Sequence, residues 1–255
     1  MKIISQLVRA DLVAFRSIAL SDSVDVLIWV AVVLLINVYL FPAFGVPREF
    51  ILLSFAGTVS SAISFRTMAS IYSLVTDLYG DYSIAQKLIL PIHPVWIFVS
   101  MTISYFIMAC IVSLGVLPLG VLILWRFFPS LSISLGHFVA IWLMSALFFS
   151  VFAIWVASFV KSPHQMGKVF IRFIFPLWFF GGLQFTWFKL YGVAPLLAYM
   201  DLLNPYIYAT EAMRTALLGP TANLDFGFCL GMLLFLMIFC FTHAYWRFKK
   251  QLDFV

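Results

Sequence analysis

The chain has 255 residues, of which 64% are hydrophobic and 10% charged, and its formal net charge is +5. A soluble globular domain has about 25% charged residues, and a chain this apolar has too little polar surface to cover a compact fold in water. Composition therefore excludes an ordinary water-soluble protein and indicates a protein that lies in a lipid bilayer. The basic residues are scattered among apolar runs rather than gathered on one soluble face, so nucleic acid is not an expected partner.

The first segment of the chain, residues 1–22, is amphipathic. Apolar residues recur at helical spacing through Lys2–Ser17, and the polar positions between them include Arg9 and Arg16. This pattern predicts an amphipathic helix that lies on the membrane surface. A solvated tail is the alternative.

Six apolar runs follow, and each is long enough to cross a bilayer with about 17 to 25 residues. They are Val26–Phe44, Phe50–Val75, Val95–Trp125, Phe138–Val160, Val169–Phe188 and Phe226–Trp246. Because Arg66 lies inside the second run, the membrane part of that helix is expected to end near it and the remainder to project into water. The third run is overlong, and Gly115, Pro118 and Gly120 are expected to break it.

The distribution of basic residues gives the expected topology. With the N-terminus in the cytoplasm and six crossings, Arg48, Arg126, Lys189 and Arg214 fall outside and the remaining Lys and Arg residues fall inside. This bias predicts six transmembrane helices with both termini in the cytoplasm. The expected fold is an all-α polytopic membrane protein with a single membrane domain, residues 1–255.

Residues 76–90 form a polar-leaning segment between the second and third runs. Gln86 and Lys87 lie in a stretch that can form a short helix, bounded by Gly80 before it and Pro91 after it. A short helix held between two spans is a site at which a cytoplasmic partner could bind and move the spans. An ordinary amphipathic loop is the alternative.

A second polar-leaning segment, residues 189–225, contains residues typical of both the start and the end of a helix. Asn204 stands at the cap, Pro205 at the first helical position and Gly219 after the end. The helix between them reaches about 21 Å, which is short of a hydrocarbon core of about 30 Å. It is therefore expected to be a re-entrant helix that enters the outer leaflet or lies on it.

Glu211 and Arg214 lie three residues apart within this helix. Side chains at this spacing share a helix face, so the two are expected to pair, which lowers the free energy of holding both charges near lipid. A structural role is expected for them rather than a direct role in transport.

The end of the fifth run combines aromatic residues with small ones. Trp178 and Phe179 precede Gly181 and Gly182, and glycines in a span permit a kink or a close approach of helices. The four residues are candidates for a transport pathway or a subunit interface. Plain helix packing is the alternative.

Several classes of function lack the residues that they need. The only Gly-Lys pair, Gly167 and Lys168, is followed by Val169 without a glycine-rich loop, so the chain has no P-loop for ATP. None of the six predicted spans has a central Asp or Glu, which disfavours a proton- or sodium-coupled carrier. The histidines lie at or near span ends and no G-x-S-x-G motif is present, so the chain is not expected to be an enzyme.

Cysteine usage gives no sign of a metal site or a disulfide framework. Cys110, Cys229 and Cys240 all lie in apolar runs, where a free cysteine behaves as a small apolar residue. No cofactor is therefore expected in this chain.

The whole arrangement resembles the membrane subunits of ABC type-2 exporters, a group that includes bacterial permeases for glycans, lipids and drugs. The resemblance covers nearly the whole chain: an amphipathic N-terminal helix, six spans, a short cytoplasmic helix after the second span and a re-entrant external region after the fifth. Its most specific part is Asn204–Gly219, NPYIYATEAMRTALLG. This stretch is similar to the family's pattern of Asn-Pro, an acidic residue, Arg and Leu-Leu-Gly.

The resemblance implies roles for individual segments. Residues 76–90 would be the coupling helix that docks on an ATPase, and residues 1–22 would be the interface helix beside it. The implied coupling residues are Asp77, Gly80, Tyr82, Gln86 and Lys87. Many relatives have a Gly-Thr pair in this helix, whereas here Asp81 takes the place of the Thr, so the alignment departs from the family there.

The resemblance also implies an assembly. The chain would be a permease in the bacterial inner membrane that works as a dimer, with a second copy of itself or a related permease. Two separate cytoplasmic ABC ATPase subunits would bind ATP and Mg, and the exported substrate would be a glycan, a lipid-linked molecule or a hydrophobic drug. A carrier or channel that works alone and a non-transporting scaffold remain as alternatives.

Overall fold

The computed structural model describes residues 2–80, 83–125, 132–220 and 224–252, and all regular secondary structure within these ranges is helical. Five segments of the described chain are helical, long and apolar enough to cross a membrane. They are Ala19–Ala43, Glu49–Tyr79, Pro94–Ile123, Leu135–Ala157 and Phe226–Lys250. The prediction of an all-α membrane-embedded protein is therefore confirmed.

The first half of the chain contains three of the five long segments, Ala19–Ala43, Glu49–Tyr79 and Pro94–Ile123. Its helices are α1 (Lys2–Arg16), α2 (Ala19–Leu35), the π-helix η1 (Ile36–Leu40), α3 (Phe41–Ala43), α4 (Arg48–Tyr79), α5 (Ser83–Leu88), α6 (Pro94–Ser113) and α7 (Val116–Ile123). The chain turns at Ser17 and Ile18, so the predicted segment 1–22 contains α1 and the start of α2. The predicted break at Gly115 is confirmed, because α6 ends two residues before it and α7 begins just after it.

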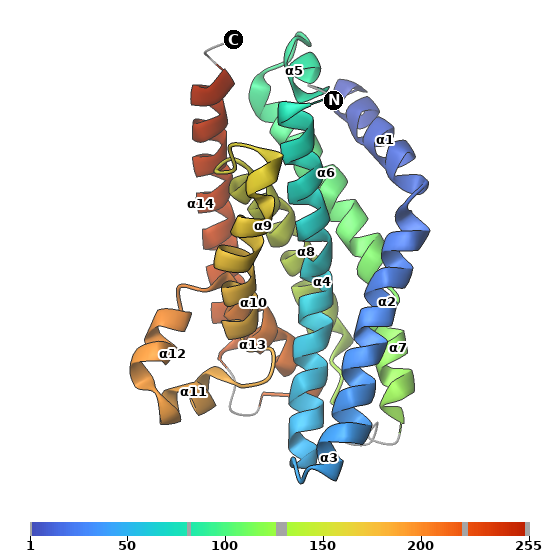
Figure 1. Cartoon of the computed structure of the whole chain (residues 1–255), viewed down its shortest axis with the longest axis vertical. Coiled ribbons are helices and arrows are strands. Elements are labelled where there is room, and N and C mark those ends of the chain that lie inside the picture. Colours follow the sequence, from blue (N-terminus) through green and yellow to red (C-terminus); the bar gives the residue numbers. More distant parts are fainter. Residues whose placement is uncertain (1, 81–82, 126–131, 221–223, 253–255) are drawn as a thin grey trace.

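The second half adds one long helix on each side of a group of short ones. Its helices are α8 (Leu135–Ala157), the 3-10 helix η3 (Pro163–Gln165), α9 (Met166–Val169), the π-helix η4 (Phe170–Ile174), α10 (Phe175–Phe180), α11 (Trp187–Val193), α12 (Pro195–Asp201), α13 (Pro205–Leu218) and α14 (Phe226–Leu252). Figure 1 shows the bundle with α1, α5 and the end of α14 at one end, called here the α5 end. The opposite end, with α3, α7, α11, α12 and α13, is called the α13 end.

The helices α4 and α8 form the centre of the bundle. In its most apolar stretch α4 is 78% buried and α8 is 61% buried, whereas the stretch beginning with α2 is 22% buried and α14 only 17%. Side chains such as Phe55 on α4 and Phe148 on α8 are fully enclosed. The peripheral helices α2 and α14 therefore present most of their apolar surface to the outside.

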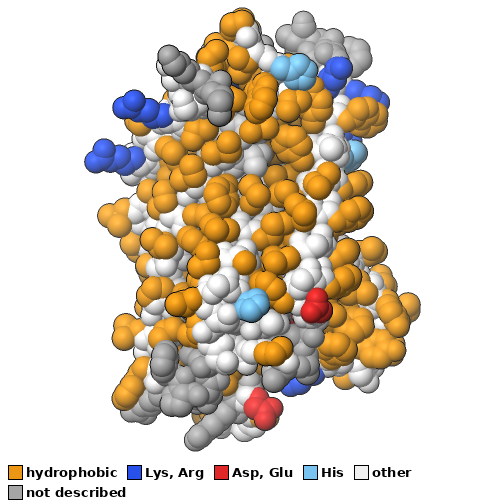
Figure 2. Space-filling view, turned by 180° about the vertical axis from the view of Figure 1, so that it is seen from behind, with side chains coloured by type: hydrophobic (Ala, Val, Ile, Leu, Met, Phe, Trp, Pro, Cys, Tyr) orange, Lys and Arg blue, Asp and Glu red, His pale blue; other side chains and the backbone are white. Residues whose placement is uncertain are grey.

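Apolar side chains cover the outer surface of the bundle. Figure 2 shows hydrophobic side chains across the middle of one face, with most of the visible Lys and Arg side chains toward the α5 end. Large exposed residues include Ile28 on α2, Phe179 on α10 and Phe235 on α14. A surface this apolar is stable against lipid or against another protein, but not against water.

Beyond Arg66, α4 continues to Tyr79 with Ile71 and Leu74 buried, and Asp22 of α2 pairs with the Arg66 guanidinium. The predicted coupling segment therefore begins inside α4. Where this helix leaves the membrane stays a prediction. The fifth run was expected to reach Phe188, but its helix ends at Phe180 where Gly181 and Gly182 turn the chain.

The turn after α10 lies directly against α4 at Gly57. A Cβ atom added to Gly57 would lie 2.2 Å from the carbonyl oxygen of Leu183, which is a backbone atom. Glycine is required here because two backbones touch, and no side-chain rotation can relieve the clash.

We predict that Gly57→Ala lowers the stability of the chain by about 1–3 kcal/mol, because the added methyl group forces two packed backbones apart. Gly231→Ala on α14 is the matched control: a Cβ there meets nothing within 4 Å. Alanine at that position should leave stability unchanged or raise it by up to about 1 kcal/mol. Thermal unfolding in detergent measures both, and equal midpoints for the two variants would contradict the prediction.

Candidate functional site

The helix α13 begins and ends at the capping residues predicted from the sequence, Asn204 and Gly219. The side chain of Asn204 accepts a hydrogen bond from the backbone N–H of Tyr206 at 3.1 Å, Pro205 is the first helical residue, and Gly219 has a φ of +87° after the end. The helix lies at the α13 end, packed against α4, α8 and α14. The predicted helix is confirmed, and its entry into the outer leaflet stays a prediction.

Asn204 also ties the start of α13 to two other helices. Its Nδ2 donates to the carbonyl oxygen of Leu177 on α10 at 2.7 Å and to Oδ1 of Asp201, the last residue of α12, at 3.0 Å. Burial raises the pKa of Asp201 to about 6; the hydrogen bond from Asn204 opposes this rise and the Glu211 charge adds to it. One amide side chain thus fixes the entry to α13 relative to α10 and α12.

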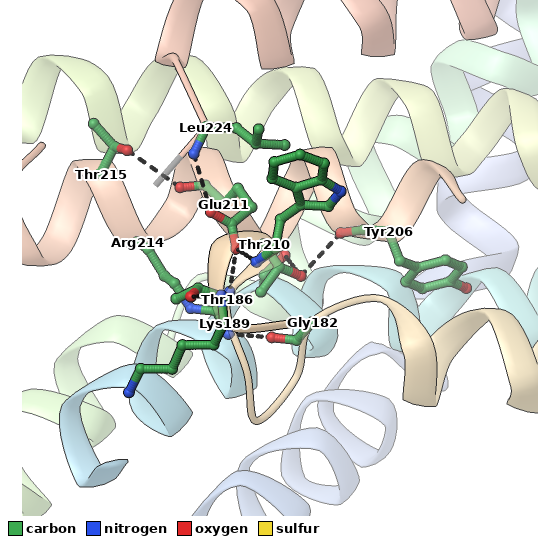
Figure 3. Close-up of polar contacts among 11 residues, drawn as sticks. Gly182, Thr186, Lys189, Tyr206, Thr210, Glu211, Arg214, Thr215 and Leu224 are labelled. Atoms are coloured by element: carbon green, nitrogen blue, oxygen red, sulfur yellow. Dashed lines mark hydrogen bonds and ion pairs between the residues drawn. The ribbon is translucent and has the colours of Figure 1, made fainter. Parts of the chain in front are cut away.

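Glu211 and Arg214 form an ion pair inside the protein. Nη1 of Arg214 donates to Oε1 of Glu211 at 2.7 Å, and both side chains are 0% exposed. Nη2 of Arg214 donates to the carbonyl oxygen of Gly182, as Figure 3 shows. Burial lowers the pKa of Arg214, and the Glu211 carboxylate opposes that shift. The predicted pairing is confirmed, in a more enclosed setting than a helix surface.

The Glu211 carboxylate also accepts two backbone hydrogen bonds. Oε1 accepts from the N–H of Trp187 at 3.0 Å, at the start of α11, and Oε2 accepts from the N–H of Leu224 at 3.1 Å, just before α14 (Figure 3). Buried charges are tolerated when every lone pair finds such a partner. The carboxylate therefore holds together three chain segments that are distant in sequence.

The residues predicted to form a pathway divide between two environments. Gly181 lies so close to α13 that an added Cβ would come within 2.2 Å of Cβ of Tyr206, and Gly182 has a φ of +75° and gives its carbonyl to Arg214. Trp178 contacts Trp29 of α2, with ring centroids 5.8 Å apart, and Phe179 is exposed. The glycines thus serve close packing, and a pathway role for the four residues stays a prediction.

At the opposite end of the bundle, α5 is bonded to two other helices, α4 and α1, and α1 is bonded in turn to α6. Oδ2 of Asp77 on α4 accepts from the N–H of Ile84 at 3.0 Å, and Nζ of Lys87 lies 2.8 Å from Oδ1 of Asp11 on α1. Oδ2 of Asp11 accepts in turn from the hydroxyl of Ser104 on α6 at 3.0 Å. The predicted short helix is confirmed, and it is fixed to the bundle rather than loosely attached.

The remaining predicted residues of this end lie at the surface or outside the described ranges. Gly80 and Gln86 are exposed, as are Arg9 and Arg16 on α1. Tyr82 lies outside the residues that the structure describes. Their predicted contacts with a partner are consistent with exposure but are not tested by it.

Sequence reasoning missed two acidic residues at this end. Asp11 pairs with Lys87 across 76 positions of sequence, and Asp22 pairs with Arg66 across 44. The guanidinium of Arg66 also lies over the ring of Phe15, 4.9 Å from its centroid. An acidic residue within an otherwise basic amphipathic helix was a signal for Asp11, but nothing local identified its partner.

Among the described residues, no group of three or more His, Cys, Asp or Glu side chains lies close enough to hold a metal ion. The sequence matches no model of a known protein family, and a comparison with curated proteins finds no match either. Function is therefore inferred from the two polar ends of this apolar bundle.

We predict that breaking the buried pair on one side is strongly destabilising. Glu211→Gln leaves the Arg214 guanidinium without its counter-charge, and Arg214→Met leaves the carboxylate, so each should lower stability by about 3–5 kcal/mol. The double variant should lose less than the sum of the two, because no unpaired charge remains. Thermal unfolding in detergent gives the three values.

The control for this cycle is Glu49→Gln, since Glu49 is an exposed residue in the first turn of α4. Its loss of charge should change stability by no more than about 0.5 kcal/mol. Strictly additive effects, or single variants that behave like the Glu49 control, would show that the Glu211–Arg214 pair does not stabilise the fold.

Proposed function

We propose that the chain is the membrane subunit of an ATP-driven exporter of the ABC type-2 kind, with the ATPase on a separate polypeptide. The observation that carries this proposal is the attachment of α5. This helix is only six residues long, yet it is bonded directly to α4 and α1 and through Asp11 of α1 to α6, and it keeps Gln86 exposed. When a partner protein binds to a short helix held in this way and displaces it, the helix can transmit that displacement to the bundle.

The bonds of α5 show which helices a displacement of α5 would move. Asp77 joins α5 to α4, and Lys87 joins it through Asp11 to α1 and α6. The helix α4 runs from the α5 end to the α13 end, where Gly57 meets the turn after α10. Packed helices move as rigid bodies, so a displacement of α5 would shift α4 and reach the opposite end.

The proposed topology has six crossings rather than five. The helix α8 finishes at the α5 end and α14 starts from the α13 end, so the chain between them must cross the bundle (Figure 1). The segment from η3 to α10, Pro163–Phe180, makes this passage and reaches about 27 Å at 1.5 Å per residue, close to the bilayer core of about 30 Å.

An even number of crossings places both ends of the chain on one side. Lys161 lies just before the segment Pro163–Phe180 and Lys168 lies near its start, Arg172 is its tenth residue, and all three side chains are exposed. Arg9 and Arg16 lie on α1. An excess of basic residues marks the cytoplasmic side, so the α5 end is the cytoplasmic end in this proposal. The membrane is then the inner membrane of a bacterial cell.

The helix α13 is the re-entrant external element of this proposal. With 14 residues it is too short to span, and it is buried among α4, α8 and α14. The neighbouring α11 and α12 expose Phe188, Leu196 and Tyr199, a mixture of aromatic and aliphatic side chains that suits the interface between lipid and water.

The transport complex in this proposal contains two membrane subunits and two ATPases. The second membrane subunit is another copy of this chain or a related permease, and its contact buries part of the exposed apolar surface. ATP and Mg bind to the ATPases, which drive alternating access through α5. The apolar, aromatic spans favour a glycan, a lipid-linked molecule or a hydrophobic drug as substrate.

The partner ATPase can be tested by purifying the tagged chain from its native membrane in mild detergent. We predict that a P-loop ATPase co-purifies in stoichiometric amount and hydrolyses ATP. Gln86→Arg should reduce the amount of co-purified ATPase about tenfold or more, because the new charge would be buried without a partner in the docked interface.

Gln184→Arg is the matched control for this experiment. Gln184 is also exposed, but it follows α10 near the α13 end, so the same substitution there should leave the co-purified ATPase unchanged. A clean preparation without any ATPase would contradict the exporter proposal and favour a carrier that works alone. An equal loss in both variants would contradict α5 as the docking site.

A further inference from the structure

A cavity of about 240 Å³ lies between α1, α4, α5 and α6 at the α5 end. Its polar lining consists of Asp11, Arg66, Ser73, Asp77, Lys87 and Tyr105. The rest of the lining is apolar and includes Phe15, Ile18 and Met101. A cavity with this many charged side chains inside an apolar bundle is expected to hold a polar ligand.

The basic side chains of the cavity have hydrogen-bonding capacity to spare. The side chain of Arg66 is only 10% exposed, and its Nε is buried without an acceptor among the described residues. Its Nη2 has a sulfur atom of Met108 as partner at 3.9 Å, which is a weak acceptor. Lys87 has three donor hydrogens. An anionic oxygen-rich group such as a phosphate would satisfy these donors.

The charges around the cavity disfavour a free anion. Arg66 pairs with Asp22 and Lys87 pairs with Asp11, and Asp77 adds a third carboxylate, so the cavity offers no net attraction to a free ion of high negative charge. Arg66 and Asp77 stand at different turns of α4 and both line the cavity, so it offers a basic and an acidic side chain at separate positions. This pattern fits a ligand that carries one phosphate and one ammonium group.

The position of the cavity indicates where such a ligand comes from. The cavity lies toward one end of the candidate spans, and Ile18, at the exposed turn between α1 and α2, forms part of its wall. Phospholipid headgroups lie at this level of a membrane, and an acyl chain could remain outside along the exposed apolar side chains of α2.

We propose that this cavity binds the headgroup of a zwitterionic phospholipid, with the phosphate on Arg66 and Tyr105 and the ammonium on Asp77. The proposal goes beyond the exporter function and does not depend on an ATPase. It depends on the cavity and on the embedding of the chain in a bilayer. A bound headgroup would contact α1, α4 and α6 at once and stabilise the α5 end.

The test uses the purified, delipidated full chain and lysophosphatidylethanolamine as the probe, with binding measured by native mass spectrometry. Tyr105→Phe removes one hydroxyl from the cavity without breaking an ion pair, and it should weaken binding about tenfold, the effect of one hydrogen bond to a charged group. Tyr72→Phe is the matched control, because Tyr72 is exposed on α4 and does not line the cavity. It should bind like the parent chain.

Further probes separate the sources of the ligand. Lysophosphatidylglycerol, which lacks the ammonium group, should bind at least tenfold more weakly than lysophosphatidylethanolamine. If free phosphoethanolamine binds as tightly as the lipid, or if inorganic phosphate competes fully, the lipid proposal is overturned. Should Tyr105→Phe fail to fold, Ser73→Leu narrows the same cavity from an exposed position and should reduce binding as well. Unchanged binding in the folded variant overturns the proposal.

Discussion

The buried ion pair between Glu211 and Arg214 determines how the α13 end of the bundle is assembled. Two charges enclosed by apolar helices need hydrogen-bond partners, and this requirement brings three other segments to the pair. Of the Arg214 nitrogens, Nη1 and Nη2 have acceptors and Nε has none among the described residues. The carbonyl of Gly182 comes from the turn after α10, and the N–H groups of Trp187 and Leu224 come from the starts of α11 and α14. The turn held by Arg214 is also the one that packs on α4, so the central helix is fixed through the same constraint.

The α5 end is held together in a different way. Its ion pairs, Asp11 with Lys87 and Asp22 with Arg66, join helices across a partly open polar cavity instead of a closed core. Pairs that keep some contact with water contribute less to stability than their distances suggest, because water competes for both charges. The side chains of these pairs are between 10% and 25% exposed, whereas those of Glu211 and Arg214 are fully enclosed.

The sequence predicted those features that depend on neighbouring residues. The start and end of Asn204–Gly219 follow from local capping chemistry, and the pairing of Glu211 with Arg214 follows from their spacing on one helix. The pairing of Asp11 with Lys87 could not be predicted, since 76 positions separate them and only the tertiary arrangement of α1 and α5 brings them together. Helix ends inside apolar runs were also misjudged for the same reason, because tertiary packing decides where such runs stop being helical.

The central claim is that α5 lies on the cytoplasmic side of a six-span bundle, with the turn after α10 on the other side. Single cysteines at Gln86 and Gln184, both exposed in the structure, report these two sides when intact bacterial cells are treated with a membrane-impermeant maleimide. The parent chain, whose Cys229 and Cys240 are buried and whose Cys110 is half-buried, gives the background. With the proposed topology, we expect Gln184→Cys to be labelled in intact cells and Gln86→Cys to be labelled only after the membrane is opened. Labelling of Gln86→Cys in intact cells would contradict it, because no cytoplasmic ATPase could then reach α5.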